Sequence, residues 1–527
     1  MKKIIMTSAL ASLFAIAMNA QTAYDAAKLT DRDLNGTARF VGMGGAMGAL
    51  GGDISVMGTN PAGIGIYRSN DIMTSFGFSA YGTESKYGGN KFNNNNNHWS
   101  YDNLGFVFAT KIGNHTPLRY VNFGFNYHRA KSFYKNMTME GVLNYSQTDL
   151  MAGQANGMLA NGVSLRELTQ NNLNPYNDNG VGWLGALGWD GLLFDYSDGE
   201  YIGVLPQDPY AGFRSRERGG IDQYDFNVAF NINDRVYLGL SIGAYDVDYT
   251  KSYYYSEDYG DKQNYVIGSD NRIDGSGFDF KMGVIVRPFE DSPFRVGVAV
   301  HTPTFYKLTY KTSAYLESNV WMHNNDTGQD ELINSYFDTY KELGDKDMNR
   351  EFRLNTPWKY NFSLGYTVGK NLALGAEYEY EDYSSAKFRY PEGERMEFET
   401  NEAKLTMKGV HTLRLGAEYK VIPQFAIRAG YNYISSVFKN DAVKYLPFNS
   451  INTDTDFANV KSRNNYTLGI GYRGNWFYAD LAYQFSTYKA DFYPFYNEFA
   501  DEGLVLPDAT KVTNTRSQVL LTLGMRF

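Results

Sequence analysis

Hydrophobic and polar residues alternate with a period of two along most of the chain beyond residue 70. The alternation is clearest in 361–368, 372–381, 413–421 and 425–433, and it indicates strands with one apolar and one polar face. We distinguish fourteen such segments, at about 71–82, 99–111, 118–130, 221–233, 235–250, 273–288, 293–312, 353–368, 371–388, 409–421, 424–437, 462–473, 475–488 and 513–527.

The connections between these segments alternate in length. Short ones occur at 112–117, 233–235, 289–292, 369–370, 422–423 and 474–475, and long ones at 83–98, 131–220, 251–272, 313–352, 389–408, 438–461 and 489–512. An even number of strands with short turns at one end and long loops at the other is typical of an outer-membrane β-barrel. The pattern therefore predicts an all-β fold, a 14-stranded antiparallel transmembrane β-barrel over residues 71–527. A soluble, secreted β-sandwich or propeller is the alternative, and it rarely shows such regular alternation.

The apolar face of each segment carries no charge through its middle, where an Arg or Lys would cost about 2–4 kcal/mol in lipid. Tyrosines near the segment ends fit aromatic girdles at the two membrane interfaces. The last segment ends in Phe527, which resembles the signal that outer-membrane assembly machinery reads. We therefore expect outer-membrane lipid and that machinery as partners.

Residues 1–20 have the pattern of a secretory signal peptide, with Lys2 and Lys3 before an apolar stretch. Cleavage after Ala20 would leave Gln21 at the new N-terminus, and cleavage after Ala17 is the alternative. The sequence thus predicts export to the outer membrane of a Gram-negative cell.

Composition and charge reduce the number of function classes that the sequence allows. The chain has no cysteine and a formal net charge of −9, which excludes thiolate chemistry and disfavours nucleic-acid binding. His301 and His411 lie within predicted strands without a catalytic partner that sequence can place. We therefore predict neither an enzyme nor a bound cofactor or metal.

A glycine-rich segment precedes the first strand. It contains Gly42, Gly44, Gly45 and Asp53, followed by Asn60-Pro61-Ala62-Gly63. The phosphate-loop signature Gly-Lys-Ser/Thr is missing, so the small residues indicate close backbone packing inside a barrel rather than nucleotide binding.

These motifs, together with the fourteen strands, resemble the FadL family of outer-membrane transporters for long-chain fatty acids and hydrocarbons, with local similarity over about 36–70. The resemblance implies a hatch in the lumen over 21–70, with Asn60 to Gly63 as its signature turn. It implies long, partly helical outer loops that capture hydrophobic ligands, and sideways release through a wall opening near a kinked third strand. The expected function is passive uptake of a hydrophobic small molecule by a monomer. The first outer loop departs from many relatives in its five consecutive Asn, 93–97, which we interpret as a solvated segment without a ligand role.

Two outer loops are unusually apolar for segments in water. The first has helical composition over 150–168, and residues 331–343 of the second fall on one helical face. We predict that the two loops form one outer ligand groove, lined by Trp183, Leu187, Trp189, Leu192 and Phe194 and by Leu332, Ile333, Tyr336, Phe337 and Tyr340. The alternative, compatible with a groove, is that these faces pack on each other as an extracellular cap.

Five cations are predicted to face the lumen: Lys281, Arg414, Arg428, Arg473 and Arg526. They could bind a ligand carboxylate, or they could pair with Glu377, Glu379, Glu418 and Asp480 across the lumen. A second function class stays open, a surface-binding or assembly protein such as a haem receptor or a secretion-complex component.

Overall fold

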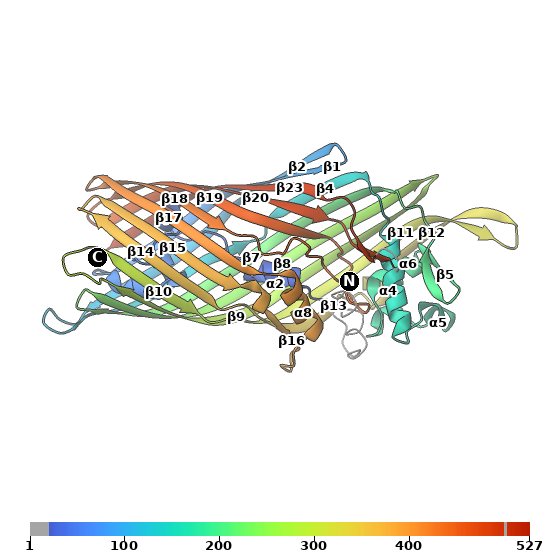
Figure 1. The fold of residues 1–527 in the computed structure, drawn as a ribbon, viewed down its shortest axis with the longest axis horizontal. Coiled ribbons are helices and arrows are strands. Elements are labelled where there is room, and N and C mark those ends of the chain that lie inside the picture. The colour runs from blue at the N-terminus through green and yellow to red at the C-terminus, as the bar shows by residue number, and fades with distance from the viewer. Residues whose placement is uncertain (1–19, 500–502) are drawn as a thin grey trace.

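The computed structural model describes residues 20–499 and 503–527, so the predicted leader lies outside the described residues except for Ala20. The fold is a closed antiparallel β-barrel of fourteen strands (Figure 1). In chain order the wall strands are β1 (Asp71–Tyr87), β2 (Asn90–Lys111), β3 (Leu118–Ser132) continued by β4 (Lys135–Val142), β7 (Tyr210–Ile232), β8 (Val236–Gly260), β9 (Gln263–Val286), β10 (Arg295–His301) continued by β11 (Phe305–Asn324), β13 (Met348–Asn355) continued by β14 (Lys359–Val368), β15 (Leu372–Asp382) continued by β16 (Lys387–Arg389), β17 (Gly409–Ile422), β18 (Phe425–Ile434), β19 (Phe457–Arg473), β20 (Phe477–Tyr493) and β23 (Thr510–Arg526).

The barrel closes where the first strand meets the last. β1 pairs with β23 from Asp71↔Arg526 to Lys86↔Lys511, and with β2 along its other edge. Closure pairs the first strand of the sheet with the last, so neither terminal strand has a free outer edge, as a membrane-spanning sheet requires. The fourteen-stranded prediction is confirmed.

Several strands extend well beyond the segments that the sequence predicted. Residues 83–98 and 251–272 are the outer parts of two β-hairpins rather than loops, with turns at Gly88–Gly89 and Asp261–Lys262. The prediction of an outer loop over 83–98 was therefore wrong, because residues 93–97 continue β2 and pair with β1. The interpretation of these asparagines as a solvated segment without a ligand role stays a prediction. Cross-strand hydrogen bonds hold them in a ladder despite the low strand preference of Asn.

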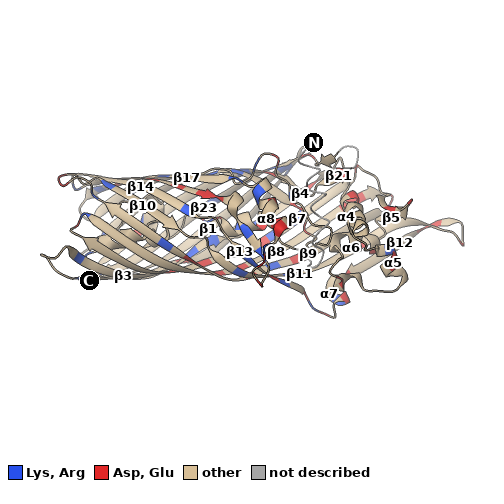
Figure 2. Ribbon diagram, turned by 60° about the horizontal axis from the view of Figure 1, so that its bottom comes forward, with Lys and Arg blue, Asp and Glu red and all other residues tan. Residues whose placement is uncertain are grey.

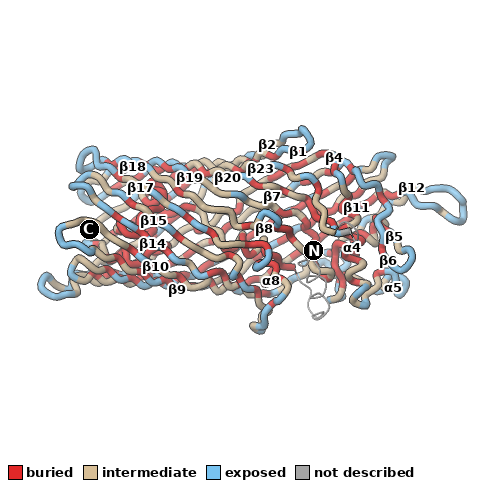
Figure 3. Tube along the Cα trace, in the orientation of Figure 1, coloured by how far each residue is buried: buried red, intermediate tan, exposed pale blue. Residues whose placement is uncertain are grey.

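The two faces of the wall separate by polarity, as the period of two requires. Side chains such as Phe123, Phe226 and Leu468 point outward and are exposed, whereas polar neighbours such as Asn122 and Asp225 are buried in the lumen. Figure 3 shows buried residues along the interior of the barrel and exposed ones at the turns. Figure 2 shows charged residues of both signs along the strands near the labels of β8 and β13. No helix of the described residues is long and apolar enough to cross a membrane.

The long connections build a cap over one end of the barrel, at the right of Figure 1. The cap and the other inserted segments comprise α4 (Thr148–Ala160), α5 (Leu165–Gln170), η3 (Pro175–Asn177), α6 (Trp183–Asp190), β5 (Phe194–Ser197), β6 (Glu200–Gly203), β12 (Gln329–Asp338), α7 (Thr339–Glu342), η4 (Tyr383–Ser385), α8 (Glu397–Thr406), β21 (Asn497–Phe499) and β22 (Gly503–Val505). The helical composition of 150–168 is confirmed by α4 and α5.

The prediction of a helix over 331–343 was wrong. Residues up to Asp338 form β12, which pairs with β11 in the register Leu332↔Trp321 to Asp338↔Tyr315, and only α7 of four residues follows. A long strand already leaves the barrel here, and pairing with it satisfies the backbone over ten residues. An isolated helix of this length would be marginal in water.

The segment before β1 lies inside the barrel as a hatch. It contains α2 (Ala23–Thr30), α3 (Ala38–Gly42), η1 (Ile54–Gly58) and η2 (Pro61–Ile66), and nearly all of its apolar side chains are buried. The division of the chain into a hatch domain over 21–70 and a barrel domain over 71–527 stays a prediction, although β1 begins at Asp71.

We expect the cap to face the exterior and the short turns the periplasm. An epitope inserted between Gly88 and Gly89 should be detected by antibody on intact cells, because this turn belongs to the capped end and a Cβ on either glycine would meet nothing within 4 Å. An epitope between Gly369 and Lys370 should be detected only after permeabilisation. The reverse result for both insertions would invert the topology.

Candidate ligand path through the barrel

The hatch is packed against a row of inward-facing glycines. Gly365, Gly375, Gly416 and Gly430 are register partners on β14, β15, β17 and β18, so they lie side by side across four strands. A Cβ on Gly375 would lie 2.0 Å from the carbonyl oxygen of Ala46 in the hatch. One on Gly430 would lie 2.2 Å from the backbone nitrogen of Gly44, far inside van der Waals contact. This glycine row lets the hatch backbone lie directly on the wall.

The predicted hatch motifs occupy the contact with the wall. Gly44 and Gly45 have positive φ, which suits the turn after α3, and Gly42 accepts a hydrogen bond from Thr467. Asp53 caps η1 by accepting from the backbone nitrogen of Ser55, and it also accepts from the Thr37 hydroxyl at 2.8 Å.

The Asn60-Pro61-Ala62-Gly63 turn forms η2 and rests on a second glycine pair. The Asn60 side chain accepts from the backbone nitrogen of Ala62, and Pro61 begins the helical turn. A Cβ on Gly283 would lie 2.0 Å from Asn60 Oδ1, and one on Gly239 would lie 2.3 Å from the backbone nitrogen of Ala62. The motif is therefore a packing element in the structure.

Charged side chains fasten the hatch to the wall next to α2. Lys131 Nζ lies 2.5 Å from Asp31 and 3.0 Å from Asp33, Arg463 lies 2.7 Å from Asp31, and Arg516 lies 3.0 Å from Asp33. We name these five residues the hatch latch. Burial disfavours ionisation of Asp31, but Arg463 and Lys131 outweigh it and hold the pKa of its carboxyl well below the usual range. The pKa of Asp33 is lowered in the same way, against burial, by Lys131, Arg516 and Arg463.

A second set of ion pairs continues along the lumen. Arg39 of the hatch donates to both carboxylate oxygens of Glu418, at 2.9 and 3.0 Å. Glu418 also accepts from Arg428 at 2.7 Å, and Arg428 reaches Asp480 at 2.6 Å. The hatch is thus joined to the wall by a bidentate pair within a buried chain of charges.

Four of the five predicted lumen cations are engaged in ion pairs. Arg414 pairs with Glu377 and Glu379, and Arg428 with Glu418 and Asp480, as the pairing alternative expected. Two others use acids that the sequence did not suggest: Lys281 pairs with Asp225 and Asp279, and Arg526 with Asp71. Arg473 instead lies over the ring of Tyr478, 5.0 Å from its centroid. A role in ligand binding stays a prediction for all five.

An interior cavity of about 270 Å³ lies between the hatch, the wall and the cap. Its lining includes Tyr24 of α2, Tyr310 of β11 and Phe438 of the segment after β18. The hatch latch also borders it, and eight Lys or Arg against six Asp or Glu line the space. The cavity is therefore partly apolar with an excess of positive charge, a chemistry that suits a ligand with an apolar body and an anionic end.

The wall ladder is interrupted beside this cavity. β2 pairs with β3 only from Asn103↔His128 to Lys111↔Tyr120, and within the described part of the chain its residues 90–102 pair with β1 alone. The third wall strand breaks between Ser132 and Lys135, and β4 continues along β7. We name the junction between residues 90–102 of β2 and residues 129–142 the wall seam.

Side chains close the wall seam where backbone bonds are missing. The rings of His98 and Tyr134 stack with centroids 4.0 Å apart, and Tyr81 donates a hydrogen bond to Ser132. Tyr81, Ser132 and Tyr134 also line the interior cavity. The resemblance to FadL implied a wall opening near a kinked third strand, and the cavity reaches the break in this strand. An opening at this place stays a prediction.

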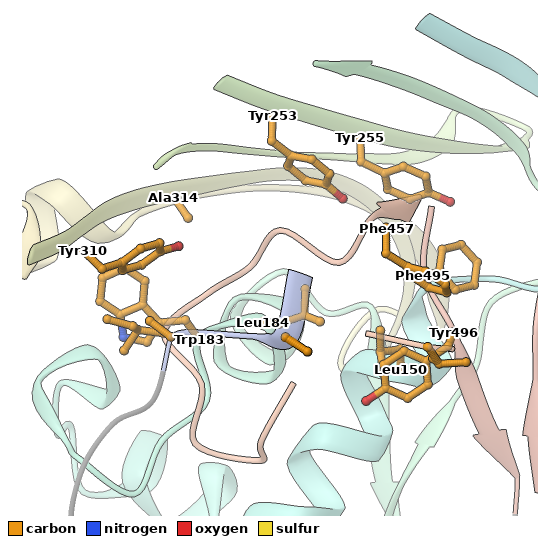
Figure 4. Close-up of a cluster of buried hydrophobic side chains, with 14 of the residues drawn as sticks. Leu150, Trp183, Leu184, Tyr253, Tyr255, Tyr310, Ala314, Phe457, Phe495 and Tyr496 are labelled. Atoms are coloured by element: carbon orange, nitrogen blue, oxygen red, sulfur yellow. The ribbon is translucent and has the colours of Figure 1, made fainter. Parts of the chain in front are cut away.

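The residues predicted to line an outer groove lie in or around the core of the cap. Trp183, Leu187 and Phe194 are buried, whereas Trp189 and Leu192 are partly exposed. Figure 4 shows Trp183 and Leu184 among aromatic side chains from distant strands, Tyr253, Tyr310 and Phe457 included. A ligand could reach Trp183 and Leu187 only if the cap opened, because neither exposes any surface.

The second predicted groove wall lies on β12 and α7. Leu332, Ile333 and Phe337 are partly exposed, and Tyr336 and Tyr340 are exposed. The two loops do meet, because α6 is in contact with β12. Phe337 and Trp189 also pack against the same apolar cluster. Whether they bind a ligand stays a prediction.

The segment between β18 and β19 was predicted only as an outer loop, yet it folds into the mouth of the barrel. Ile451, Asp454 and Thr455 are buried, and Asp454 pairs with Lys251 at 2.7 Å. The backbone nitrogen of Trp183 donates to the carbonyl of Ser450. Its few apolar residues give no periodicity, so no sequence signal marked this insertion or the partners of the hatch latch.

Comparison with known proteins supports the same fold. Residues 221–475 match the family model described as "Outer membrane protein transport protein (OMPP1/FadL/TodX)". The resemblance to the FadL family is confirmed. The FadL-like barrel resembles a Pseudomonas aeruginosa FadL homologue with a TM-score of 0.52 at 14% identity, over 94% of this chain and 99% of that one. This likeness shows the fold.

Two further solved structures are similar over the same extent. The Pseudomonas putida toluene transporter TodX has 10% identity and a TM-score of 0.47, and the Ralstonia pickettii toluene transporter TbuX has 13% and 0.45. Each comparison covers 94% of this chain and 99% of the other. Comparison with curated proteins finds no match.

The contact between the glycine row and the hatch can be tested directly. Gly375→Val should displace the hatch, because overpacking of this kind costs about 1–3 kcal/mol, and conductance in planar bilayers should rise. Deleting residues 21–65 should raise conductance further while the barrel still assembles, since each wall strand bonds to its neighbours. In the deleted chain Gly375→Val should have no added effect. Equal conductance of all four proteins would show that the hatch does not obstruct the lumen.

The hatch latch predicts a response to acid. Because both aspartates have lowered pKa values in the folded protein, they stabilise it above about pH 4 and lose this contribution as the pH falls further. Conductance should therefore rise below about pH 4. Asp31→Asn with Asp33→Asn should raise it already at pH 7, since losing a partner from a buried pair costs about 3–5 kcal/mol. A pH profile identical in the variant and the parent would contradict this role.

Proposed function

We propose that this FadL-like protein is a passive outer-membrane transporter that takes up hydrophobic molecules such as long-chain fatty acids or hydrocarbons. The observation that carries the proposal is the interior cavity of about 270 Å³, which adjoins both the hatch latch and the wall seam. The family model describes outer-membrane transport proteins, and two similar structures are toluene transporters. Transport along this path requires neither catalysis nor a cofactor.

The lining of the cavity favours one part of this ligand range. Its cation excess would attract a carboxylate, and the rings of Tyr24, Phe438 and Tyr310 would cover an apolar chain. Burial of that chain would contribute roughly 25 cal/mol per Å² removed from water. We therefore place a fatty acid ahead of an uncharged hydrocarbon as the ligand.

The path has three steps in this proposal. The ligand enters between α6 and β12 when the cap opens, and it then occupies the interior cavity above the hatch. It leaves sideways through the wall seam once the His98–Tyr134 stack separates. Only side chains need to move at the seam, because no backbone ladder links residues 90–102 to β3 or β4 among the described strands.

Location and assembly follow from the same proposal. We propose that residues 1–20 direct export and are removed, and that the mature chain works as a monomer in the outer membrane. The described barrel closes within one chain, from β1 to β23. The strand β12 is exposed and could bind a protein partner. A surface-binding role is therefore the second candidate function.

Uptake of labelled oleate and labelled toluene into liposomes tests the proposal. With His98→Cys and Tyr134→Cys, a short thiol-to-thiol cross-linker should close the wall seam and reduce uptake about tenfold or more. The control pair Ser252→Cys with Asp270→Cys joins exposed register partners of the β8–β9 hairpin, away from the seam and the cavity, and should leave uptake unchanged. The chain has no cysteine of its own, so labelling is confined to these sites.

The outcomes separate the alternatives. Faster uptake of oleate than of toluene would support the role of the cation excess. Undiminished uptake with the seam cross-linked would exclude the lateral path while leaving transport intact. No uptake of either compound by the unmodified protein would contradict the transport proposal and favour a surface-binding role.

A further inference from the structure

Two carboxylates are buried on the inner side of α8. Glu399 and Glu402 lie one helical turn apart and are 1% and 4% exposed. Glu402 accepts hydrogen bonds from the backbone nitrogens of Ala23, at 2.9 Å, and Tyr445, at 3.2 Å. Neither side-chain oxygen of Glu399 has a hydrogen-bond partner in the described part of the protein. The two carboxylates therefore share one buried site, in which Glu402 accepts hydrogen bonds and Glu399 accepts none from the described residues.

This site holds no cation among the described residues. Neither glutamate forms an ion pair with Lys, Arg or His there, unlike Glu377, Glu379 and Glu418 in the lumen. Burial raises the pKa of Glu399 to about 7 and that of Glu402 to about 8, and Glu399 and Asp25 add to the rise at Glu402. Burying carboxylates without a counter-charge is costly, so a positively charged group bound at this site would be stabilised by the two carboxylates and would offset that cost.

The beginning of the hatch lies against the same helix. α2 and α8 are in contact and are labelled next to each other in Figure 1. Ala20, Gln21, Thr22 and Ala23 are each at most 2% exposed. The Gln21 side-chain nitrogen is buried and has no hydrogen-bond partner in the described structure. Chain ends are ordinarily at the surface, so a start of the mature chain at this depth needs a specific partner.

We propose that Glu399 and Glu402 form a receptor for the α-ammonium group that leader cleavage creates on Gln21. Hydrolysis of the Ala20–Gln21 peptide bond by a signal peptidase consumes one water and leaves a carboxylate on Ala20 and an ammonium on Gln21. That nitrogen lies at most about 7 Å along the chain from the Ala23 nitrogen, which already contacts Glu402. The ammonium supplies the positive charge that the site lacks.

The receptor distinguishes the two cleavage positions left open by the sequence. Cleavage after Ala17 would place the ammonium three residues earlier, about 10 Å farther along an extended chain. Cleavage after Ala20 places it at the buried start of the hatch. Docking of the ammonium would strengthen the existing contact between α2 and α8 only in the processed chain, so the hatch would reach its final stability after export. This inference concerns maturation and does not depend on which molecule the barrel transports.

Mass spectrometry of the purified outer-membrane protein is the first test. The N-terminal peptide should begin at Gln21 with a free amine. A chain that begins at another residue, or a Gln21 cyclised to pyroglutamate, has no ammonium to bind at this position and would overturn the proposal. This measurement needs no variant.

Charge removal at the receptor is the second test. Glu399→Gln with Glu402→Gln keeps the shape and the acceptor for Ala23 but leaves the ammonium unpaired. Resistance to unfolding in detergent at pH 7 should fall, whereas Glu397→Gln, on the exposed side of the same helix, should behave as the parent. If the carboxylates hold no cation, the amides relieve a burial cost and stability stays equal or rises, which would contradict the proposal.

Amine reactivity distinguishes docking from a general effect on folding. At pH 7 an acylating reagent should modify Gln21 in the folded parent at least tenfold more slowly than in the unfolded chain. The double variant should lose most of this protection, and Glu397→Gln should keep it. If the double variant does not assemble, protection in the parent decides: an amine as reactive in the folded protein as in the unfolded one would show that it is not bound.

Discussion

The contact between the hatch backbone and the glycine row of the wall is the constraint on which the rest of the structure depends. Gly375, Gly416 and Gly430 carry no side chain toward the lumen, so the hatch occupies space that wall side chains fill in a small barrel. The lumen is therefore closed by a separate segment of chain. A separate segment can shift as a unit, whereas wall side chains cannot leave without unfolding strands.

The polar interactions of the lumen follow from that arrangement. A hatch held only by van der Waals contact would have no preferred register, and the pairs from Asp31, Asp33 and Arg39 to the wall supply one. Buried ion pairs add little net stability, but losing one partner is costly. They therefore define a closed position sharply, and a bound anion near the hatch latch could compete for the same cations.

The cap and the wall seam place the moving parts at the two ends of the interior cavity. Above it, the cap is an apolar cluster whose residues come from α4, α6, long strands and the inserted segment after β18. Beside it, the third wall strand is interrupted at Phe133 and Tyr134, between β3 and β4. Side-chain contacts such as the His98–Tyr134 stack close the wall there. Opening either end breaks side-chain contacts rather than a hydrogen-bonded wall, which keeps the barrel intact during transport.

The sequence by itself determined the barrel, because a period of two, an even strand number and alternating loop lengths are local properties of the chain. It also determined that a small-residue segment lies inside, and that residues 150–168 are helical. It misplaced 331–343 as a helix, since the apolar spacing there fits both a helix face and a strand, and only the neighbouring β11 selects the strand. Which cation meets which carboxylate, as Lys281 meets Asp225, was decided by the tertiary structure alone, because the barrel brings together strands far apart in sequence. The same holds for the wall seam, because neither Asn103 nor His128, where the ladder between β2 and β3 ends, is a proline or glycine that would mark the end in the sequence.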